Sequence, residues 1–477
     1  MKSYEMIVGL EVHAQLQTRA KVFAPEAVTF GEQPNRYVSV VSLGYPGSLP
    51  VLNRACIEAV VRLGLALRCE IAREFYFSRK NYFYPDLPKG YQITQEAAPI
   101  ARKGEVWIRL PDGARHRVGI TRLQLEEDTG KSLHDQDPFD TLLDFNRAGI
   151  GLVEIVSEPD LRTPQQAMAY LAHIRRLVRF LGICDGNMEE GSLRCDANIS
   201  VRRVGQKGYG TRVEIKNLNS ISALGKALEY EFARQVRLLE EGHSVGRETR
   251  TWDGTQTVPL REKESADDYR YFPEPDLPPV RLTEEEILRL AESLPPLPEE
   301  LFDQLCGSYG LSAEEATLLI EDRPYAEYFL ALLGEGVPPK TASSWINGPI
   351  RAYLNEAAVE MEAFPVPASR LAELIRLVED RQISLTAARE QVFPALVQAP
   401  QRSPRELAEE KDLLLLQDQA QVEAWIDEVL AQHPDKVETY RKGKAGLLGF
   451  FVGQVVRRSG GKADPKWVQQ RLLEKLH

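Results

Sequence analysis

The sequence of 477 residues predicts an α+β protein: a domain built on a mixed or antiparallel sheet, then an all-α domain, then a small α-helical tail. Two changes of pattern carry this prediction. Residues 1 to about 280 alternate apolar and polar side chains between Gly, Pro and Asn turns, which is typical of short strands. Beyond the proline-rich stretch 272–279 short helices take over, and a second break follows at 400–404. Domains are therefore expected at 1–292, 293–404 and 405–477.

Two apolar runs in the first part predict strands that carry acidic side chains. Residues 6–16 alternate, so their apolar side chains share one face of a strand and Glu11 and His13 lie side by side on the other. Residues 152–156 are apolar and β-branched around Glu154, which is typical of a buried strand. A buried carboxylate must be paired, protonated or bound to a metal. These acids together suggest a site for a hard cation.

Each of these acids also has an ordinary structural interpretation. Glu11 and His13 could form the wet face of an antiparallel strand, and an arginine partner could satisfy Glu154. The acidic run 126–128 ends a second alternating stretch and, considered alone, predicts a solvated turn before Thr129 and Gly130.

Helix signals are clearest at capped ends. Residues 163–181 form a predicted helix, because Thr163 can cap it and a proline fits its first turn, and a second is predicted at 221–241. In the second part, Thr283 with Glu286 and Ser312 with Glu315 fit the capping box at a helix start.

Composition points to a cytoplasmic protein that does not enter a membrane. No run approaches 18 apolar residues, the N-terminus has no signal-peptide pattern, and five scattered cysteines without a C-x-x-C motif indicate reduced thiols.

The net charge of −11 argues against a nucleic-acid partner, but it is unevenly distributed. Residues 281–328 hold twelve acids and three cations, whereas residues 441–477 hold nine cations and two acids. The basic C-terminal segment keeps nucleic-acid binding open.

Eight segments in fixed order give the chain a family resemblance. They include I-V-G-L-E-V-H at 7–13, E-I-V-S-E-P-D at 154–160 and E-I-K-N-L-N-S at 214–220; the others are 42–50, 79–86, 89–95, 188–198 and 268–276. Together they resemble the B subunit of the tRNA-dependent amidotransferase, which converts Glu-tRNA(Gln) or Asp-tRNA(Asn) to the amide form. The resemblance covers almost the whole chain. It implies a catalytic cradle domain, a helical domain and a tRNA-binding tail domain.

The resemblance also implies a carbon–nitrogen ligase that uses ATP, Mg²⁺ and glutamine as amido donor. Matched residue by residue, Glu11, His13, Glu127 and Glu154 correspond to the metal ligands. Because imidazole is an unusual ligand for Mg²⁺, His13 could act through water, or the site could accept Mn²⁺. The familiar P-loop is absent, since the first glycine required before Gly130-Lys-Ser132 is replaced by Leu125. The nucleotide site is therefore atypical.

Further pocket residues follow from the same resemblance. Arg79, Lys80 and Lys89 are expected to be catalytic, with Lys80 near the mouth of an ammonia tunnel, and Asp196 is expected to be a further metal contact. The expected pocket for ATP and the aminoacyl end comprises Tyr82, Tyr84, Tyr91, Arg194 and Asn198. Without the resemblance, the aromatic and basic cluster indicates a packed loop with snorkelling cations.

The tail and the partners complete the expectation. Residues expected to contact tRNA phosphates are Arg441, Lys442, Lys444, Arg457, Arg458 and Lys462. Expected partners are an amidase-type glutaminase A subunit and a small C subunit in a heterotrimer, together with misacylated tRNA; a non-discriminating aminoacyl-tRNA synthetase stays open as another.

Many relatives carry C-x-C and C-x-x-C pairs that can bind zinc. Here those positions are Ala24, Glu26, Ser39 and Ser42, so no zinc is expected.

Two other functions fit parts of the sequence. A non-catalytic tRNA-binding scaffold would not need the full set Glu11, His13, Glu127 and Glu154. A ligase acting on a small molecule would not need a basic tail.

Overall fold

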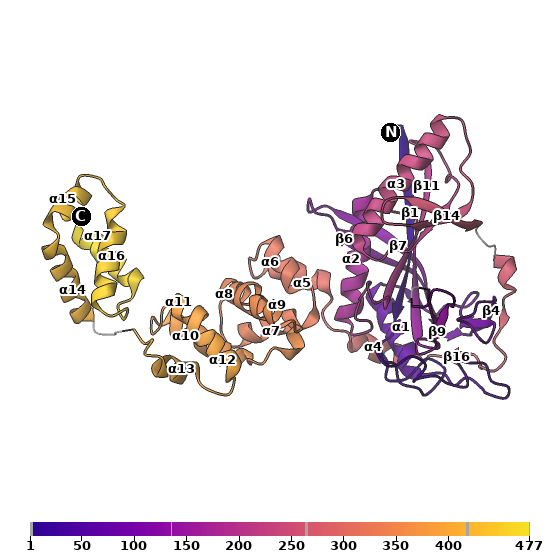
Figure 1. Ribbon diagram of the computed structural model, residues 1–477, viewed down its shortest axis with the longest axis horizontal. Coiled ribbons are helices and arrows are strands. Elements are labelled where there is room, and N and C mark those ends of the chain that lie inside the picture. The colour runs from indigo at the N-terminus through magenta and orange to yellow at the C-terminus, as the bar shows by residue number, and fades with distance from the viewer. Residues whose placement is uncertain (1–2, 135, 263–265, 416–418, 477) are drawn as a thin grey trace. The chain divides into compact units, whose positions relative to one another are not determined.

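In the computed structural model, which describes residues 3–134, 136–262, 266–415 and 419–476, contacts divide the chain into two units, residues 1–300 and 301–477. The first unit is rich in strands and the second is helical (Figure 1). The α+β class predicted from the sequence is therefore confirmed. The finer boundaries at 292 and 404 stay predictions.

A nine-stranded sheet is the frame of the first unit among the described residues. Its order is β14 (Thr257–Glu262), β13 (Glu248–Trp252), β12 (Val213–Lys216), β11 (Leu193–Arg203), β1 (Tyr4–Gln15), β10 (Gly151–Ser157), β7 (Arg115–Glu127), β6 (Ala101–Arg109) and β2 (Glu70–Ile71). Neighbouring strands are antiparallel except β12 and β13, which are parallel. The long strand β1 lies at the centre, which places Glu11 and His13 in mid-sheet.

The two faces of this sheet differ in chemistry. One face packs against α1 (Arg54–Ala66), α2 (Pro164–Phe180) and α3 (Ile221–Glu240) and forms the main hydrophobic core. Even-numbered residues of β1 from Met6 to Ala14 are buried there, as the alternation predicted. Because alternate side chains point to opposite faces, Glu11 and His13 project from the other face. The sheet therefore separates a helix-covered apolar layer from a polar surface.

A second, small sheet adjoins β7. It consists of β15 (Phe272–Pro273), β4 (Ser78–Asn81) and β5 (Tyr91–Thr94), and β5 contacts β7. Two further strand pairs are β16 (Val280–Arg281) with β3 (Glu74–Phe75), and β8 (Lys131–Leu133) with β9 (Leu142–Asp144). The small sheet brings the segment that contains Lys80 next to the acidic end of β7.

The predicted helices and caps are confirmed, and one helix was missed. Thr163 caps α2, Ser220 caps α3, and both predicted capping boxes are present. The sequence analysis did not identify α1, although Asn53 accepts a hydrogen bond from the N–H of Ala55 at its start. Helix α4 (Glu284–Glu292) and the short turn η1 (Ala266–Tyr269) complete the elements wholly within the first unit.

The described part of the second unit is built of short helices. They are α5 (Pro298–Gly307), which begins at the boundary, α6 (Ala313–Leu319), α7 (Arg323–Gly334), α8 (Pro339–Trp345), η2 (Ile346–Ile350), α9 (Arg351–Ala357), η3 (Met361–Ala363), α10 (Ala368–Glu379), α11 (Leu385–Ala387), η4 (Ala388–Val392), α12 (Phe393–Gln398), α13 (Pro404–Glu410), α14 (Gln419–Gln432), α15 (Pro434–Arg441), α16 (Leu447–Arg458) and α17 (Pro465–Leu476). Helices α14 to α17 share a core around Ile426, Phe451 and Leu472. Across the described ranges, no helix has the length and apolar character needed to span a bilayer.

Candidate active site

Cross-strand pairing arranges the polar face in rows. Glu11 pairs with Asp196 of β11, and His13 pairs with Arg194 on one side and Glu154 on the other. Glu154 in turn pairs with Gln124 of β7. Directly opposed side chains are about 4.5–5.5 Å apart at their Cβ atoms. Acids from three central strands therefore meet around one imidazole.

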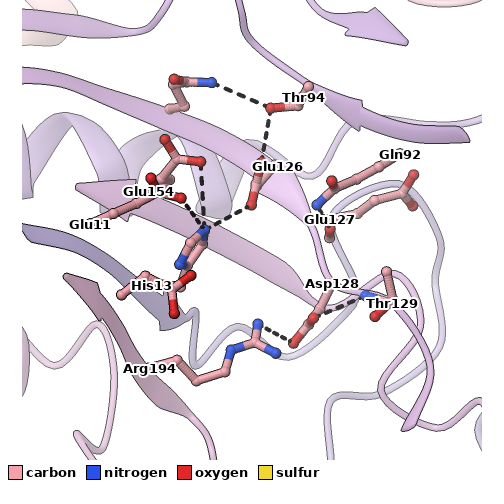
Figure 2. Close-up of polar contacts among 12 residues, drawn as sticks. Glu11, His13, Gln92, Thr94, Glu126, Glu127, Asp128, Thr129, Glu154 and Arg194 are labelled. Atoms are coloured by element: carbon pink, nitrogen blue, oxygen red, sulfur yellow. Dashed lines mark hydrogen bonds and ion pairs between the residues drawn. The ribbon is translucent and has the colours of Figure 1, made fainter. Parts of the chain in front are cut away.

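The imidazole of His13 is the centre of this cluster. Its Nε2 atom lies 3.5 Å from Glu154 Oε2, 3.6 Å from Glu126 Oε1 and 3.7 Å from Glu11 Oε1. Figure 2 shows the three contacts converging on His13. One donor atom each from Glu11, His13 and Glu154 also lies within 4.8 Å of the others. Four protein groups thus point into one small volume.

These spacings fit a divalent cation. For metal–oxygen distances of about 2.1–2.6 Å, neighbouring ligands of an octahedron are roughly 3.0–3.7 Å apart. The contacts from His13 Nε2 to the three carboxylates fall at the upper end of that range, so these groups would have to move several tenths of an ångström closer together around Mg²⁺, whose bonds to oxygen are about 2.0–2.1 Å. The three carboxylate oxygens suit Mn²⁺ as well as Mg²⁺, whereas the imidazole nitrogen is an unusual ligand for Mg²⁺.

The charges of the cluster also favour a cation. Burial and the charge of Glu154 raise the pKa of Glu11 to about 7, and the same two effects raise the pKa of Glu126. Burial would lower the pKa of His13, but its hydrogen bond to Glu154 and the neighbouring acids raise this pKa to about 9. The carboxylates therefore repel one another, and a proton on His13 partly offsets their charge. A bound metal ion would replace that proton.

The structure brings Glu126, rather than Glu127, to the predicted ligand set. The alternation of β7 puts Gln124 and Glu126 on the polar face, and Glu126 accepts a hydrogen bond of 2.9 Å from Thr94. The side chain of Glu127 points to the opposite face of the sheet, because it is the next residue along the strand. Its carboxylate accepts from the N–H of Ile93 at 2.9 Å and forms a buried ion pair with Lys89. Three of the four predicted ligands, Glu11, His13 and Glu154, are thus together, and Glu127 lies apart (Figure 2).

The run 126–128 is not a solvated turn. All three acids are buried, which makes the isolated interpretation of this run wrong. Asp128 accepts hydrogen bonds from Gln15 at 2.8 Å and pairs with Arg194 at 2.9 Å. Burial opposes ionisation of Asp128, but Arg194 and Arg147 hold its pKa below the usual value. Asp128 and Arg194 therefore form one wall of the site.

The predicted residues Arg79 and Lys80 have different surroundings, because neighbours on a strand point to opposite faces. The guanidinium of Arg79 forms two hydrogen bonds, of 2.7 and 2.8 Å, to the buried carboxylate of Glu274. Arg79 thereby fastens β4 to the segment after β15. The ammonium of Lys80 lies 4.8 Å from the ring centre of Tyr269, and its charge helps to lower the pKa of Glu154. Lys80 thus faces the acid cluster.

Aromatic rings surround these cations. Tyr91 packs beneath Arg79, with 4.1 Å between its ring centre and Cζ, and lies 5.0 Å from the ammonium of Lys89. The rings of Tyr82 and Tyr84 meet edge to face at 5.8 Å. Tyr82 is half-buried and burial raises its pKa, whereas Tyr84 is exposed. The three tyrosines therefore lie together along the small sheet, and their part in a pocket for ATP or the aminoacyl end stays a prediction.

Asp196 and Asn198 of β11 extend the site along the main sheet. The carboxylate of Asp196 lies 2.6 Å from the ammonium of Lys216 on β12. Asn198 pairs with Gly9 on one side and Glu214 on the other. Lys216 was not singled out from the sequence, although it lies in the segment 214–220 that carries the resemblance and follows the apolar residues Val213 and Ile215 of the same strand.

The positions at which the resemblance implies cysteines in many relatives include two buried serines, near a buried lysine. Ser39 and Ser42 are buried, and Ser39 Oγ accepts from the N–H groups of Val41 and Ser42. The ammonium of Lys21 donates to the carbonyl oxygens of Tyr37 at 2.7 Å and Ala148 at 2.6 Å. Burial lowers the pKa of Lys21 to about 8. A lysine thus ties this loop to residue 148, and the absence of zinc stays a prediction.

Three of the six predicted cations of the tail are paired with its own acids. Arg458 pairs with Glu428, Lys462 with Asp412 and Lys442 with Glu438. Arg441 donates to the carbonyl oxygen of Leu476. Lys444 and Arg457 are exposed, and no ion pair with the other described residues is found for either.

The chain is similar to known proteins along almost its whole length. Residues 6–288 match the model of the GatB/GatE catalytic domain, and residues 327–476 match that of the GatB domain. Three similar proteins are each named as the B subunit of an aspartyl/glutamyl-tRNA(Asn/Gln) amidotransferase. The one from Thermosynechococcus vestitus is 49% identical and is aligned over 100% of this chain and 97% of its own. Those from Alkalilimnicola ehrlichii and Azotobacter vinelandii are 48% and 47% identical, with 99% of each chain aligned.

The chain therefore belongs to the family of aspartyl/glutamyl-tRNA(Asn/Gln) amidotransferase B subunits. The family resemblance identified from the eight sequence segments is confirmed.

Proposed function

We propose that the chain catalyses the ATP-dependent amidation of Glu-tRNA(Gln), Asp-tRNA(Asn) or both. The convergence of Glu11, Glu126 and Glu154 on His13 carries the proposal, because such a set suits the Mg²⁺ or Mn²⁺ ion that phosphoryl transfer requires. A divalent cation held there would offset the charge of the phosphate oxygens. Lys80, Arg122 and Lys216 supply further positive charge at the edges of the cluster.

The proposed reaction has two steps. An oxygen of the side-chain carboxylate attacks the γ-phosphorus of ATP, the bond to the bridging oxygen breaks, and ADP leaves. Ammonia then attacks the acyl carbon of the resulting acyl phosphate. The C–O bond to phosphate breaks, phosphate departs with the electron pair, and the nitrogen loses a proton. The first step makes the second possible, since a free carboxylate does not react usefully with ammonia at neutral pH.

Ammonia would come from a glutaminase partner. Four of the five cysteines are poorly suited to glutamine hydrolysis: Cys56, Cys69, Cys184 and Cys195 are buried, and burial raises the pKa of each thiol. An amidase-type A subunit and a small C subunit would complete a heterotrimer, and the tail would bind tRNA. The segment with Lys80, Tyr82 and Lys89 would receive ammonia beside the acid cluster.

The substitution Glu154→Gln tests this function in the assembled enzyme. Amidation of each misacylated tRNA with ATP and glutamine should fall by about 10²–10³, because an electrostatic contact to the reacting phosphate is weakened. Glutamine hydrolysis should remain measurable, and ammonium should replace glutamine in the wild-type enzyme. Glu240→Gln, at the exposed end of α3, is the matched control. Amidation at the wild-type rate by both variants would remove the acid cluster from the mechanism.

A further inference from the structure

Lys216 is held at a fixed position on the polar face of the sheet. It is the last residue of β12, and the next residue, Asn217, has the left-handed φ of 64° that ends the strand. The side-chain amide of Asn217 donates to the carbonyl oxygen of Trp252 at 3.1 Å, which ties this turn to β13. The backbone beneath Lys216 is therefore fastened on both sides, by strand pairing and by this amide.

The ammonium of Lys216 is oriented by acids of the neighbouring strand and of its own. Its Nζ lies 2.6 Å from Asp196 Oδ2 and 4.0 Å from Glu214 Oε1. Burial opposes its charge, but Asp196 and Glu214 raise the pKa of Lys216, so that it stays protonated. The side chain nevertheless keeps 34% of its surface exposed. A charged group is thus held in one place while it can still be reached by a ligand.

Lys216 and Glu11 lie in the same cross-strand row. Ala197 pairs with Ile215, which places Asp196 beside Lys216, and Asp196 pairs with Glu11. On the far side of Glu11 the row continues through Val156 to Arg122 of β7. Adjacent strands are about 4.8 Å apart, so Lys216 and Arg122 flank the acid cluster from opposite sides. Arg122 lies 3.6 Å from Glu154, whereas the nearest acid to Lys216 is Asp196, outside the three that surround His13.

We infer that Lys216 binds phosphoryl oxygens of the nucleotide beside Glu11, and that Asp196 is a positioning residue for Lys216 rather than a metal ligand. This inference rests on the proposed function. A lysine is a compact point charge suited to phosphate, and a fixed cation there stabilises charge that develops on the transferring group. Asp196 is already engaged at hydrogen-bond distance, and a metal ion on its carboxylate would repel the adjacent ammonium.

The test uses the full assembled enzyme with ammonium as nitrogen donor. Lys216→Met should lower kcat/KM for ATP by about 10²-fold, and Lys216→Arg should restore part of it because charge is kept. Binding of Mn²⁺ alone should stay within about twofold of wild type, since no metal ligand is removed. Lys226→Met, an exposed lysine of α3, is the matched control.

Asp196→Asn separates a positioning residue from a metal ligand. A positioning role predicts a lower kcat/KM for ATP, unchanged Mn²⁺ affinity, and a double variant Asp196→Asn/Lys216→Met no worse than Lys216→Met. The double variant also removes both members of the Asp196–Lys216 pair, which guards against misfolding caused by one of them left without the other. Wild-type ATP kinetics in the double variant would overturn the inference, as would weakened Mn²⁺ binding in Asp196→Asn. If Glu154→Gln is itself active, the proposed function fails; if only Lys216→Met is normal, this inference alone fails.

Discussion

Charged residues meet in both units, but burial separates the two cases. In the first unit Lys89 and Glu127 form an ion pair in which each side chain is only 3% exposed, and three carboxylates surround His13 nearby. In the tail, Arg458 and Glu428 pair while 40% and 49% exposed. Water screens the second pair and not the first. The number of charges therefore says little about chemistry until their burial is known.

The tail also shows how a count along the sequence can mislead. Residues 441–477 hold nine cations against two acids, which suggests a strongly basic surface. Helix α14 lies before that segment and supplies Glu423, Asp427 and Glu428, which pair with Arg471, Lys475 and Arg458. The folded tail is therefore less basic than its last 37 residues suggest. Lys444 and Arg457, for which the described residues supply no such acid, are better candidates for phosphate contacts.

Breaking one ion pair in each unit should change the free energy of unfolding by very different amounts, and this is the largest effect we expect. Glu127→Gln leaves the buried ammonium of Lys89 without its charge partner and should lower the free energy of unfolding by about 3–5 kcal/mol. Glu428→Gln breaks a surface pair and should cost no more than about 1 kcal/mol. Denaturant unfolding of the two variants measures both values. Equal losses would show that burial does not separate these pairs.

Metal binding should distinguish two adjacent acids. Glu126→Gln removes a group that faces His13, so Mn²⁺ affinity should fall by more than the roughly 10–100-fold typical of outer-shell partners. Glu127→Gln should leave Mn²⁺ affinity closer to wild type, because that carboxylate faces Lys89. Titration calorimetry on the folded variants measures both affinities. The opposite ranking would favour the ligand set implied by the family resemblance over the one seen in the structure.

The alternation of side chains along a strand explains why part of this site was predictable from the sequence. Alternation in β1 places Glu11 and His13 on one face, and the apolar run around Glu154 predicts a buried strand. The same reasoning applied to β7 predicts Glu126 as the ligand. Leu123 and Leu125 face the core, so Gln124 and Glu126 face the other side of the sheet, where Glu11 and His13 lie. The family match instead indicated Glu127. Helix α1 also had an available signal, since Cys56, Val60 and Leu63 follow helical spacing after Asn53.

Contacts between distant segments could not be predicted in this way. Arg79 is expected from the sequence to be catalytic, yet Glu274, almost 200 residues away, binds its guanidinium. Lys216 meets Asp196 only because β12 pairs with β11. Neither partner can be read from local periodicity, because pairing between strands depends on the topology of the whole sheet.

Metal affinity should depend on pH in the first unit. A bound cation requires neutral His13 and ionised Glu11, whose pKa values are raised to about 9 and about 7. Since the proton-free forms bind, Mn²⁺ affinity should rise with pH, by about tenfold per unit between 7 and 9 from His13, and more steeply below 7. Calorimetry at about pH 8 in buffers of different ionisation enthalpy should detect close to one released proton. An affinity independent of pH would contradict this arrangement.

The smallest expected effect compares two pairs of cations in the tail. Arg458 and Lys462 must leave Glu428 and Asp412 before they can meet tRNA phosphates, whereas the described residues hold no ion pair of Lys444 or Arg457 that must first be broken. Replacing Lys444 and Arg457 by alanine should therefore flatten the salt dependence of tRNA binding by about one slope unit per lost contact. Replacing Arg458 and Lys462 should change the slope less. Binding of the assembled enzyme to tRNA across a salt series gives both slopes, and glutamine hydrolysis in each variant controls for assembly. If Arg458→Ala/Lys462→Ala flattens the slope more, the tail acids do not limit these cations, and the count of basic residues along the sequence is the better guide.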